Sequence, residues 1–233
     1  MILMTVLAVI LARGGSKGIP RKNLRKLSGT PIVEWCIRSA KASKRIDGVL
    51  LSSDDDEILQ LGIRLGCDIH ERNHKDALDT TSSEQSLLAA INESNEASGA
   101  SVFVLIQPTS PLTLPQDFDS AIETYFERKL DSLVSVVPNH TFLWELREGG
   151  HSIPNYDPEN RPRRQEIEGQ FAENGAFYIT SRELLEGRNC RLGGRIGMHV
   201  MEPHHSVEID DEIDFIILEE LVKILKLAPV SFE

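Results

Sequence analysis

The sequence predicts a single α/β domain built on a mostly parallel, Rossmann-like sheet with helices on both faces and an inserted arm. Apolar runs rich in Val, Ile and Leu alternate with amphipathic stretches of roughly a dozen residues, as in repeated strand–helix–strand units. This alternation fails over residues 139–169, where prolines and charges interrupt any long period. With 233 residues, the chain is too short for two catalytic domains. We therefore predict one domain, residues 1–233, with residues 139–169 as the inserted arm.

The first half of the chain shows the alternation in order. Short apolar runs predict four strands, at residues 5–11, 48–52, 68–70 and 102–106. Pro31 is a first-turn residue that opens the first helix. The second helix begins in the acidic stretch 54–57, which its dipole favours, and ends at Gly66. A third helix begins at Ser82 or Ser83, either of which can cap it.

The second half continues the pattern around the arm. The loop at residues 107–111 follows a buried strand, and ligands of open α/β sheets bind at the carboxyl ends of strands. The remaining predicted elements are a helix at 115–128, strands at 132–137, 176–180 and 197–201, and a closing helix at 211–227.

Charge and cysteine content limit the possible partners and compartment. A formal net charge of −11 disfavours nucleic-acid binding, because a phosphate backbone attracts a basic surface. The apolar run at residues 2–11 is too short to span a membrane and lacks the flanks of a signal peptide. Cys36, Cys67 and Cys190 have no paired spacing, so neither a zinc site nor a disulfide framework is indicated. We expect a cytoplasmic protein that binds no nucleic acid and no membrane.

The strongest functional signal is the string LARGGSKGIPRKN, residues 11–23, directly after the first predicted strand. Its glycines let backbone amides approach phosphate oxygens, while Arg13 can bind two oxygens and Lys17 adds a point charge. The string is not a P-loop, because it has no glycine-lysine-serine/threonine ending. It is not a dinucleotide fingerprint either, because the glycine spacing is wrong and Asp54, the first acid after the second strand, comes too late. The sequence therefore predicts a loop that wraps a polyphosphate.

Several segments together resemble the CMP-sialic acid synthetases, or N-acylneuraminate cytidylyltransferases. The matching segments are the glycine-rich string at 11–23, QPTSP at 107–111, RPRRQ at 161–165, ENGAFY at 173–178 and HSVEID at 205–210. The resemblance covers nearly the whole chain and implies a nucleotidyltransferase version of the predicted sheet. It also implies a reaction in which the anomeric hydroxyl of a nine-carbon 2-keto-3-deoxy sugar acid attacks the α-phosphorus of CTP, releasing pyrophosphate and the CMP-sugar.

The resemblance also assigns the nucleotide to particular side chains. These nucleotide-binding residues are Arg13, Gly14, Gly15, Lys17, Lys22, Asn23, Arg72, Thr81 and Ser83. It implies that Arg13 and Lys17 hold the phosphates and that Asn23 lies near the reacting α-phosphate, so that Lys17 and Asn23 count as catalytic. Arg72, Thr81 and Ser83 match positions that contact the ribose and base, although such side chains can equally be helix caps and solvated surface.

The resemblance assigns the sugar acid to the loop at residues 107–111 and to the arm. The substrate-binding residues that the resemblance implies are Gln107, Thr109, Ser110, Arg161 and Arg164. An amide such as Gln107 offers a donor and an acceptor to a polyhydroxylated ligand, and a guanidinium suits the carboxylate of the acid. Arg161 matches a catalytic arginine, although a merely basic surface arm would carry the same charges. In the resembling enzymes this arm crosses to a second subunit, so we expect a homodimer or homotetramer.

Glu208 and Asp210 are the candidate ligands for Mg²⁺, or Mn²⁺ in its place. Residues two apart in an extended segment project to the same side, which suits two oxygens on one hard metal. The resembling enzymes have two aspartates here, so Glu208 keeps the carboxylate but extends its reach. His204 and His205 would point to opposite faces of a strand, which argues against joint metal binding.

Other functions remain open on the sequence alone. The acid could be KDN, legionaminic or pseudaminic acid, or the eight-carbon KDO, because differences of one hydroxyl or acyl group in the pocket decide among them. A nucleotide-binding sensor without catalysis is an alternative of another class, and it would be expected to lack Lys17 or the carboxylates. The glycine spacing argues against a dehydrogenase of the Rossmann type.

Overall fold

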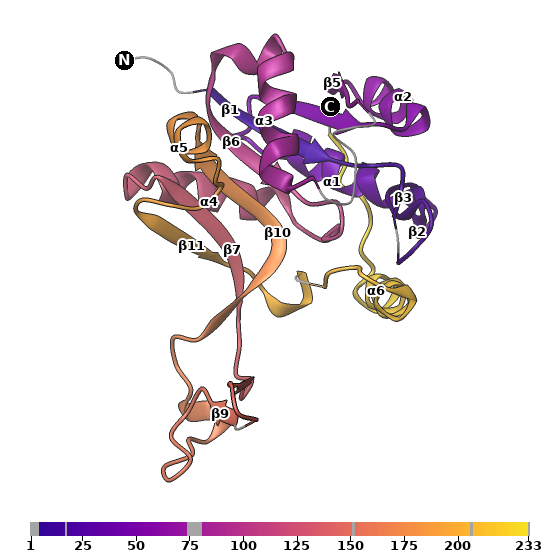
Figure 1. Ribbon diagram of the computed structural model, residues 1–233. Coiled ribbons are helices and arrows are strands. Elements are labelled where there is room, and N and C mark those ends of the chain that lie inside the picture. Colours follow the sequence, from indigo (N-terminus) through magenta and orange to yellow (C-terminus); the bar gives the residue numbers. More distant parts are fainter. Residues whose placement is uncertain (1–4, 17, 74–80, 151, 206, 233) are drawn as a thin grey trace.

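The computed structural model describes residues 5–16, 18–73, 81–150, 152–205 and 207–232, and its centre is a seven-stranded sheet (Figure 1). The strand order is β11-β7-β10-β6-β1-β4-β5. These strands are β1 (Thr5–Leu11), β4 (Gly48–Ser53), β5 (Asp68–Glu71), β6 (Ala100–Ile106), β7 (Ser132–Pro138), β10 (Phe171–Ser181) and β11 (Ile196–Val200). Only β10 runs antiparallel to its neighbours, β6 and β7. The predicted mostly parallel sheet is confirmed.

Helices cover both faces of this sheet, as predicted. They are α1 (Ile32–Ala42), α2 (Asp56–Arg64), α3 (Ser83–Glu93), α4 (Pro115–Glu127) and α5 (Arg182–Arg188). A further helix, α6 (Glu212–Leu225), packs in a separate core cluster with Leu27 and Trp35. Val6, Ala8 and Ile10 of β1 pack in one core cluster with α1, α2 and α4. Leu7 and Val9, which alternate with them, pack in a second cluster with α3 and α5. This alternation follows from the two-residue period of a strand buried on both sides.

The helix ends follow the predicted caps closely. The Asp55 side chain accepts hydrogen bonds from the N–H groups of Glu57 and Ile58, which makes it the cap of α2. Ser82 caps α3 in a reciprocal arrangement with Gln85. Within the described ranges, no helix is both long enough and apolar enough to cross a membrane.

Some elements differ from the prediction. The short pair β2 (Lys26–Leu27) and β3 (Thr30–Pro31) and helix α5 were not anticipated, because each is too short to show a period. The expectation of a strand at His204 and His205 was wrong, since both lie in a 3₁₀ turn, Pro203–His205. Their rings therefore lie together, with centroids 4.1 Å apart, instead of facing opposite ways.

The arm leaves the body between β7 and β10 and projects well beyond the sheet (Figure 1). It contains a small antiparallel pair, β8 (Trp144–Leu146) with β9 (Ser152–Pro154), and a 3₁₀ turn, Arg164–Glu166. Tyr156 contacts Phe142, with ring centroids 4.6 Å apart, and Trp144, at 6.2 Å. The arm thus has a small aromatic cluster of its own.

Replacing Phe118 by alanine is expected to lower the free energy of unfolding by about 3–5 kcal/mol. Phe118 is fully buried on α4, and its ring lies edge-on to that of Phe177 with centroids 5.1 Å apart. Urea denaturation followed by circular dichroism measures the loss. Phe126→Ala, on the same helix but only partly buried, is the control and should cost less. Equal losses for the two variants would contradict this account of the core.

Candidate active site

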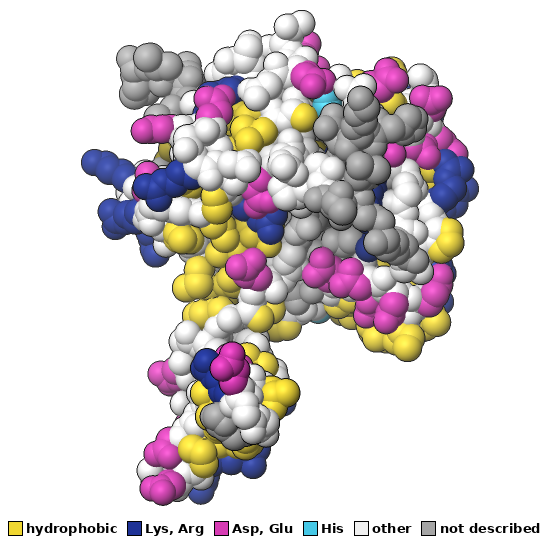
Figure 2. Space-filling view, in the orientation of Figure 1, with side chains coloured by type: hydrophobic (Ala, Val, Ile, Leu, Met, Phe, Trp, Pro, Cys, Tyr) yellow, Lys and Arg dark blue, Asp and Glu magenta, His cyan; other side chains and the backbone are white. Residues whose placement is uncertain are grey.

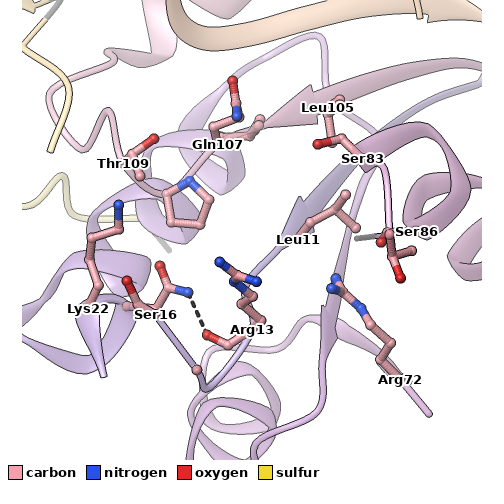
Figure 3. Close-up of a pocket in the computed structure, with 15 residues that line it drawn as sticks. Leu11, Arg13, Ser16, Lys22, Arg72, Ser83, Ser86, Leu105, Gln107 and Thr109 are labelled. Carbon is pink, nitrogen blue, oxygen red and sulfur yellow. Dashed lines mark hydrogen bonds between the residues drawn. The ribbon is translucent and has the colours of Figure 1, made fainter. Parts of the chain in front are cut away.

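A cavity of about 320 Å³ opens at the carboxyl ends of β1 and β6, where the fold predicts a ligand. Three parts of the chain surround it, as Figure 3 shows: the glycine-rich loop after β1, the loop that follows β6, and the start of α3 together with Arg72, which follows β5. Leu11 and Leu105 supply apolar surface between them. The structure therefore brings together most of the residues that the sequence assigned to a nucleotide.

The glycine-rich loop contributes Arg13, Gly15, Ser16, Lys22 and Asn23 to the cavity. The side-chain amide of Asn23 donates a hydrogen bond of 2.8 Å to the backbone carbonyl of Arg13, shown dashed in Figure 3. Asn23 thus closes the loop on itself, and the Arg13 side chain extends into the cavity. Lys17 lies outside the described residues.

Gly14 anchors this loop from behind and does not line the cavity. Its N–H donates to a carboxylate oxygen of Asp54 at 2.8 Å. A Cβ at Gly14 would lie 2.7 Å from the Cβ of Asp55, so only glycine fits this close approach. Arg21 adds a second link, because its guanidinium contacts Glu57 at 2.9 Å and Asp55 at 3.2 Å. The acidic stretch, interpreted from the sequence as a helix start, therefore also positions the glycine-rich loop.

The opposite wall of the cavity is hydroxyl-rich. Thr81 and Ser83 line it, as does Arg72, which is 7% exposed. Ser86 joins them, although the sequence reading missed it. Ser86 stands three residues after Ser83 on α3, and residues at that spacing share a helix face. A search for further hydroxyls at helical spacing from Ser83 would have found it.

The loop after β6 divides its side chains between the cavity and the core. Gln107 and Thr109 line the cavity, and the Gln107 N–H donates to the carbonyl of Ala176 at 3.1 Å. Ser110, also assigned to the substrate, is fully buried, and its hydroxyl lies 3.4 Å from the Asn174 carbonyl that accepts its hydrogen bond. Ser110 therefore fixes the turn and does not reach the cavity.

The candidate metal ligands lie beside this loop. The Ile209 N–H donates to the Thr109 carbonyl at 2.9 Å, and the Thr109 hydroxyl donates to a Glu208 oxygen at 3.3 Å. Ile209 is fully buried, whereas Glu208 is partly buried and Asp210 is exposed. Burial, with the Asp210 carboxylate as the next cause, raises the pKa of Glu208.

Lys22 reaches the same pair of carboxylates. Its ammonium donates to the Ile209 carbonyl at 2.6 Å and lies 3.7 Å from an Asp210 oxygen. Among the described residues, no group of three or more His, Cys, Asp and Glu side chains is placed to bind a metal. Two hard oxygen ligands nevertheless fit Mg²⁺, which is commonly bound through one or two carboxylates and the phosphates of a substrate.

The arm arginines do not join this site within one chain. The Arg161 guanidinium lies over the Phe142 ring, 4.5 Å from its centroid, and 5.7 Å from that of Tyr156. Arg164 is exposed in the 3₁₀ turn. Neither lines the cavity, and the arm that carries them extends away from the body.

The family model described as cytidylyltransferase matches residues 7–221, which include the whole cavity. This chain belongs to the cytidylyltransferase family. Two solved structures share the fold of this chain with a TM-score of 0.69. One is CMP:2-keto-3-deoxy-manno-octonic acid synthetase complexed with CTP, 16% identical, with 96% of this chain and 100% of that one covered. The other is 4-diphosphocytidyl-2C-methyl-D-erythritol synthase from Anaerococcus prevotii, 13% identical, with 94% and 96% covered. At these identities the likeness confirms the fold alone.

The chain is also similar in sequence to more closely related proteins. It is 37% identical over 219 residues to N-acylneuraminate cytidylyltransferase A of Danio rerio and 38% identical over 221 residues to N-acylneuraminate cytidylyltransferase of Oncorhynchus mykiss. The alignments cover 92% and 93% of this chain but 50% of each relative, so the chain spans about half their length. It is also 29% identical to post-translational flagellin modification protein B of Campylobacter coli, over 97% of this chain and 99% of the relative. These matches confirm the resemblance carried by the sequence segments.

Proposed function

We propose that this chain transfers CMP from CTP to the anomeric hydroxyl of a sialic-acid-type nine-carbon 2-keto-3-deoxy sugar acid, giving the CMP-sugar and pyrophosphate. The observation that carries this proposal is the convergence of Arg13, Arg72 and Gln107 on one cavity. A polyphosphate loop, a hydroxyl-rich wall and a loop suited to a polyhydroxylated ligand then lie side by side. The relatives named N-acylneuraminate cytidylyltransferase support the choice of acceptor.

The acceptor could also be a related acid. The relative named for flagellin modification matches nearly end to end, and it favours keeping legionaminic, pseudaminic, KDN and KDO acids as alternatives. A catalytically inactive nucleotide sensor is the alternative of another class. The sequence keeps both Lys17 and the carboxylates of Glu208 and Asp210, which argues against it.

The reaction needs little covalent chemistry from the protein, so positioning and charge neutralisation carry the catalysis. Arg13 binds phosphate oxygens, and Lys17 adds a second positive charge. Asn23 donates a hydrogen bond to the Arg13 carbonyl, and this bond holds the glycine-rich loop beside the α-phosphate. Gln107 orients the sugar so that its anomeric oxygen faces the α-phosphorus. Mg²⁺ or Mn²⁺, held by Glu208 and Asp210, would neutralise the charge that develops on the phosphates.

The arm completes the site in a second copy of the chain, giving a homodimer or a homotetramer built from such dimers. Leu143, Trp144 and Leu146 on the arm are 54%, 60% and 73% exposed, and Figure 2 shows hydrophobic side chains on its surface. Exposed apolar surface of this kind favours a protein partner. Arg161 and Arg164, which do not reach their own cavity, would then bind the carboxylate of the sugar acid in the partner's cavity.

A reducing compartment such as the cytoplasm is part of this proposal. Cys36, Cys67 and Cys190 are all free thiols. Burial raises the pKa of the Cys36 thiol to about 12, which makes it unreactive. Structural disulfides, the usual mark of an oxidising compartment, are not among the described features.

A pyrophosphate-release assay tests the proposed function. We expect turnover with CTP, a sialic acid and Mg²⁺, and at least about tenfold less with UTP or ATP, because the hydroxyl-rich wall must distinguish the base. A panel of KDN, legionaminic, pseudaminic and KDO acids identifies the acceptor. Equal use of UTP with sugar phosphates would contradict the assignment, and tight CTP binding without turnover would favour the sensor.

A further inference from the structure

A buried chain of polar side chains connects the cavity to the far end of α3. Arg72 donates to the Ser52 hydroxyl oxygen through Nε and Nη2, each at 3.3 Å. That hydroxyl lies 2.9 Å from His70 Nδ1, and His70 Nε2 lies 3.1 Å from a Glu93 carboxylate oxygen. Ser52 is fully buried, and His70 is only 6% exposed. These contacts run from the hydroxyl-rich wall of the cavity to the surface of the protein.

The chemistry of the donors fixes one direction along this chain. A guanidinium can only donate, so the Ser52 oxygen accepts from Arg72. The Ser52 hydroxyl hydrogen is then available to His70, and Nδ1 can accept it only when that nitrogen is unprotonated. The ring proton therefore lies on Nε2, which donates it to Glu93. The opposite tautomer would direct donors from both sides at one serine oxygen and leave the serine hydrogen without an acceptor.

We propose that Ser52, His70 and Glu93 are positioning residues that orient Arg72 toward the nucleotide. Glu93 sets the tautomer of His70, His70 sets the rotamer of the Ser52 hydroxyl, and the lone pairs of that hydroxyl then face Arg72. The Ser52 carbonyl reinforces this geometry, because it accepts from Arg72 Nη2 at 3.3 Å and from the Ala12 N–H at 2.9 Å. Ser52 therefore contacts both Arg72 and the residue that precedes Arg13.

The chain also connects a buried charged side chain, Arg72, with an exposed one, Glu93. Arg72 is buried, and burying a cation is costly unless its environment compensates it. Glu93, the last residue of α3, has a side chain that is 53% exposed and therefore contacts solvent. Ser52 and His70 link the Glu93 carboxyl group to the guanidinium of Arg72, and the hydrogen bonds in such a chain strengthen one another.

The test compares two fully buried strand serines. Ser52→Ala removes an acceptor of Arg72. Ser135→Ala, the control, removes a β7 hydroxyl that, within the described residues, hydrogen-bonds the backbone of Phe177 on β10. This inference rests on the proposed function, so KM and kcat are measured with CTP. We expect Ser52→Ala to raise the KM for CTP about tenfold with little change in kcat or in the KM for the sugar acid. Ser135→Ala should leave all three values near wild type.

Substitutions at His70 separate positioning from packing. His70→Phe fills the space but removes the acceptor, and it should raise the KM for CTP as Ser52→Ala does. His70→Asn retains a side-chain oxygen near the position of Nδ1, and it should recover most of the affinity. A KM for CTP that is the same in Ser52→Ala and Ser135→Ala, or a loss confined to kcat, would overturn the proposal.

A measurement without nucleotide distinguishes this inference from the proposed function. Long-range ¹H–¹⁵N spectra of the free protein report which nitrogen of His70 carries the proton. We expect Nε2–H in the wild type and a mixture of tautomers in Glu93→Ala. Protonation on Nδ1 in the wild type overturns the chain whether or not the protein uses CTP. Nε2–H in a protein that does not bind CTP would instead contradict the proposed function.

Discussion

Asp210→Asn is expected to lower kcat for CMP-sugar formation by a factor of about 10² or more, as for other electrostatic groups that act on a transition state. The substitution keeps the shape of the side chain and removes the charge of one of the two candidate metal ligands. Lys22, 3.7 Å from Asp210, then loses its ion-pair partner as well. We expect the remaining activity to need more Mg²⁺, because one hard oxygen ligand has become a weaker amide.

Asp211→Asn is the matched control for this experiment. Asp211 caps α6 by accepting from the N–H groups of Ile213 and Asp214, and asparagine is an equally good cap. Both kcat and the thermal midpoint should therefore stay near wild type. If Asp210→Asn kept wild-type kcat and Mg²⁺ dependence, the metal role given to this carboxylate would be wrong.

A mixture of two inactive variants, Arg13→Ala and Arg161→Ala, is expected to recover about a quarter of wild-type activity after subunit exchange. In the proposed dimer each site combines the body of one chain with the arm of the other. Half of the dimers are then mixed, and one of the two sites in each mixed dimer has both arginines. Pyrophosphate release before and after exchange measures the recovery, with exchange verified by a size tag on one variant.

The control mixes Arg13→Ala with Asp210→Asn. Both substitutions lie on the body, so every site in this mixture keeps one defect and no activity should return. Recovery in the first mixture and not in the second supports donation of Arg161 across the interface. A fully active monomer, or verified mixed dimers without activity, would show that the arm does not complete the site.

Much of the fold could be predicted because its signals are local. The apolar runs of β1 and β6 and the cap of α2 depend on neighbouring residues, and each appears where the sequence placed it. Helix α5 was not predicted, because its seven residues, which include Gly187, show no clear helical period. The turn at His205 was mistaken for a strand because short segments give no test of periodicity.

The candidate site was predictable in its residue types but not in its contacts. The contact between Gly14 and Asp54 spans 40 positions in the chain, and that between Lys22 and Ile209 spans 187. Such contacts are set by strand order, which no local pattern encodes. Ser110 shows the same limit, because its motif suggested a ligand while its place in the turn directs it to the Asn174 carbonyl.

The strand order also divides the sheet into a half that is synthesised first and a half that is synthesised later. Strands β6, β1, β4 and β5 are neighbours in the sheet and all come from residues 5–106, so one half of the sheet can pair before the rest of the chain exists. The glycine-rich loop and the hydroxyl-rich wall belong to this half. The arm emerges next, and the carboxylates last, when Ile209 reaches Thr109 across 100 residues of chain. The proposed nucleotide site therefore forms early, whereas the proposed metal ligands, Glu208 and Asp210, arrive only when the fold is closed.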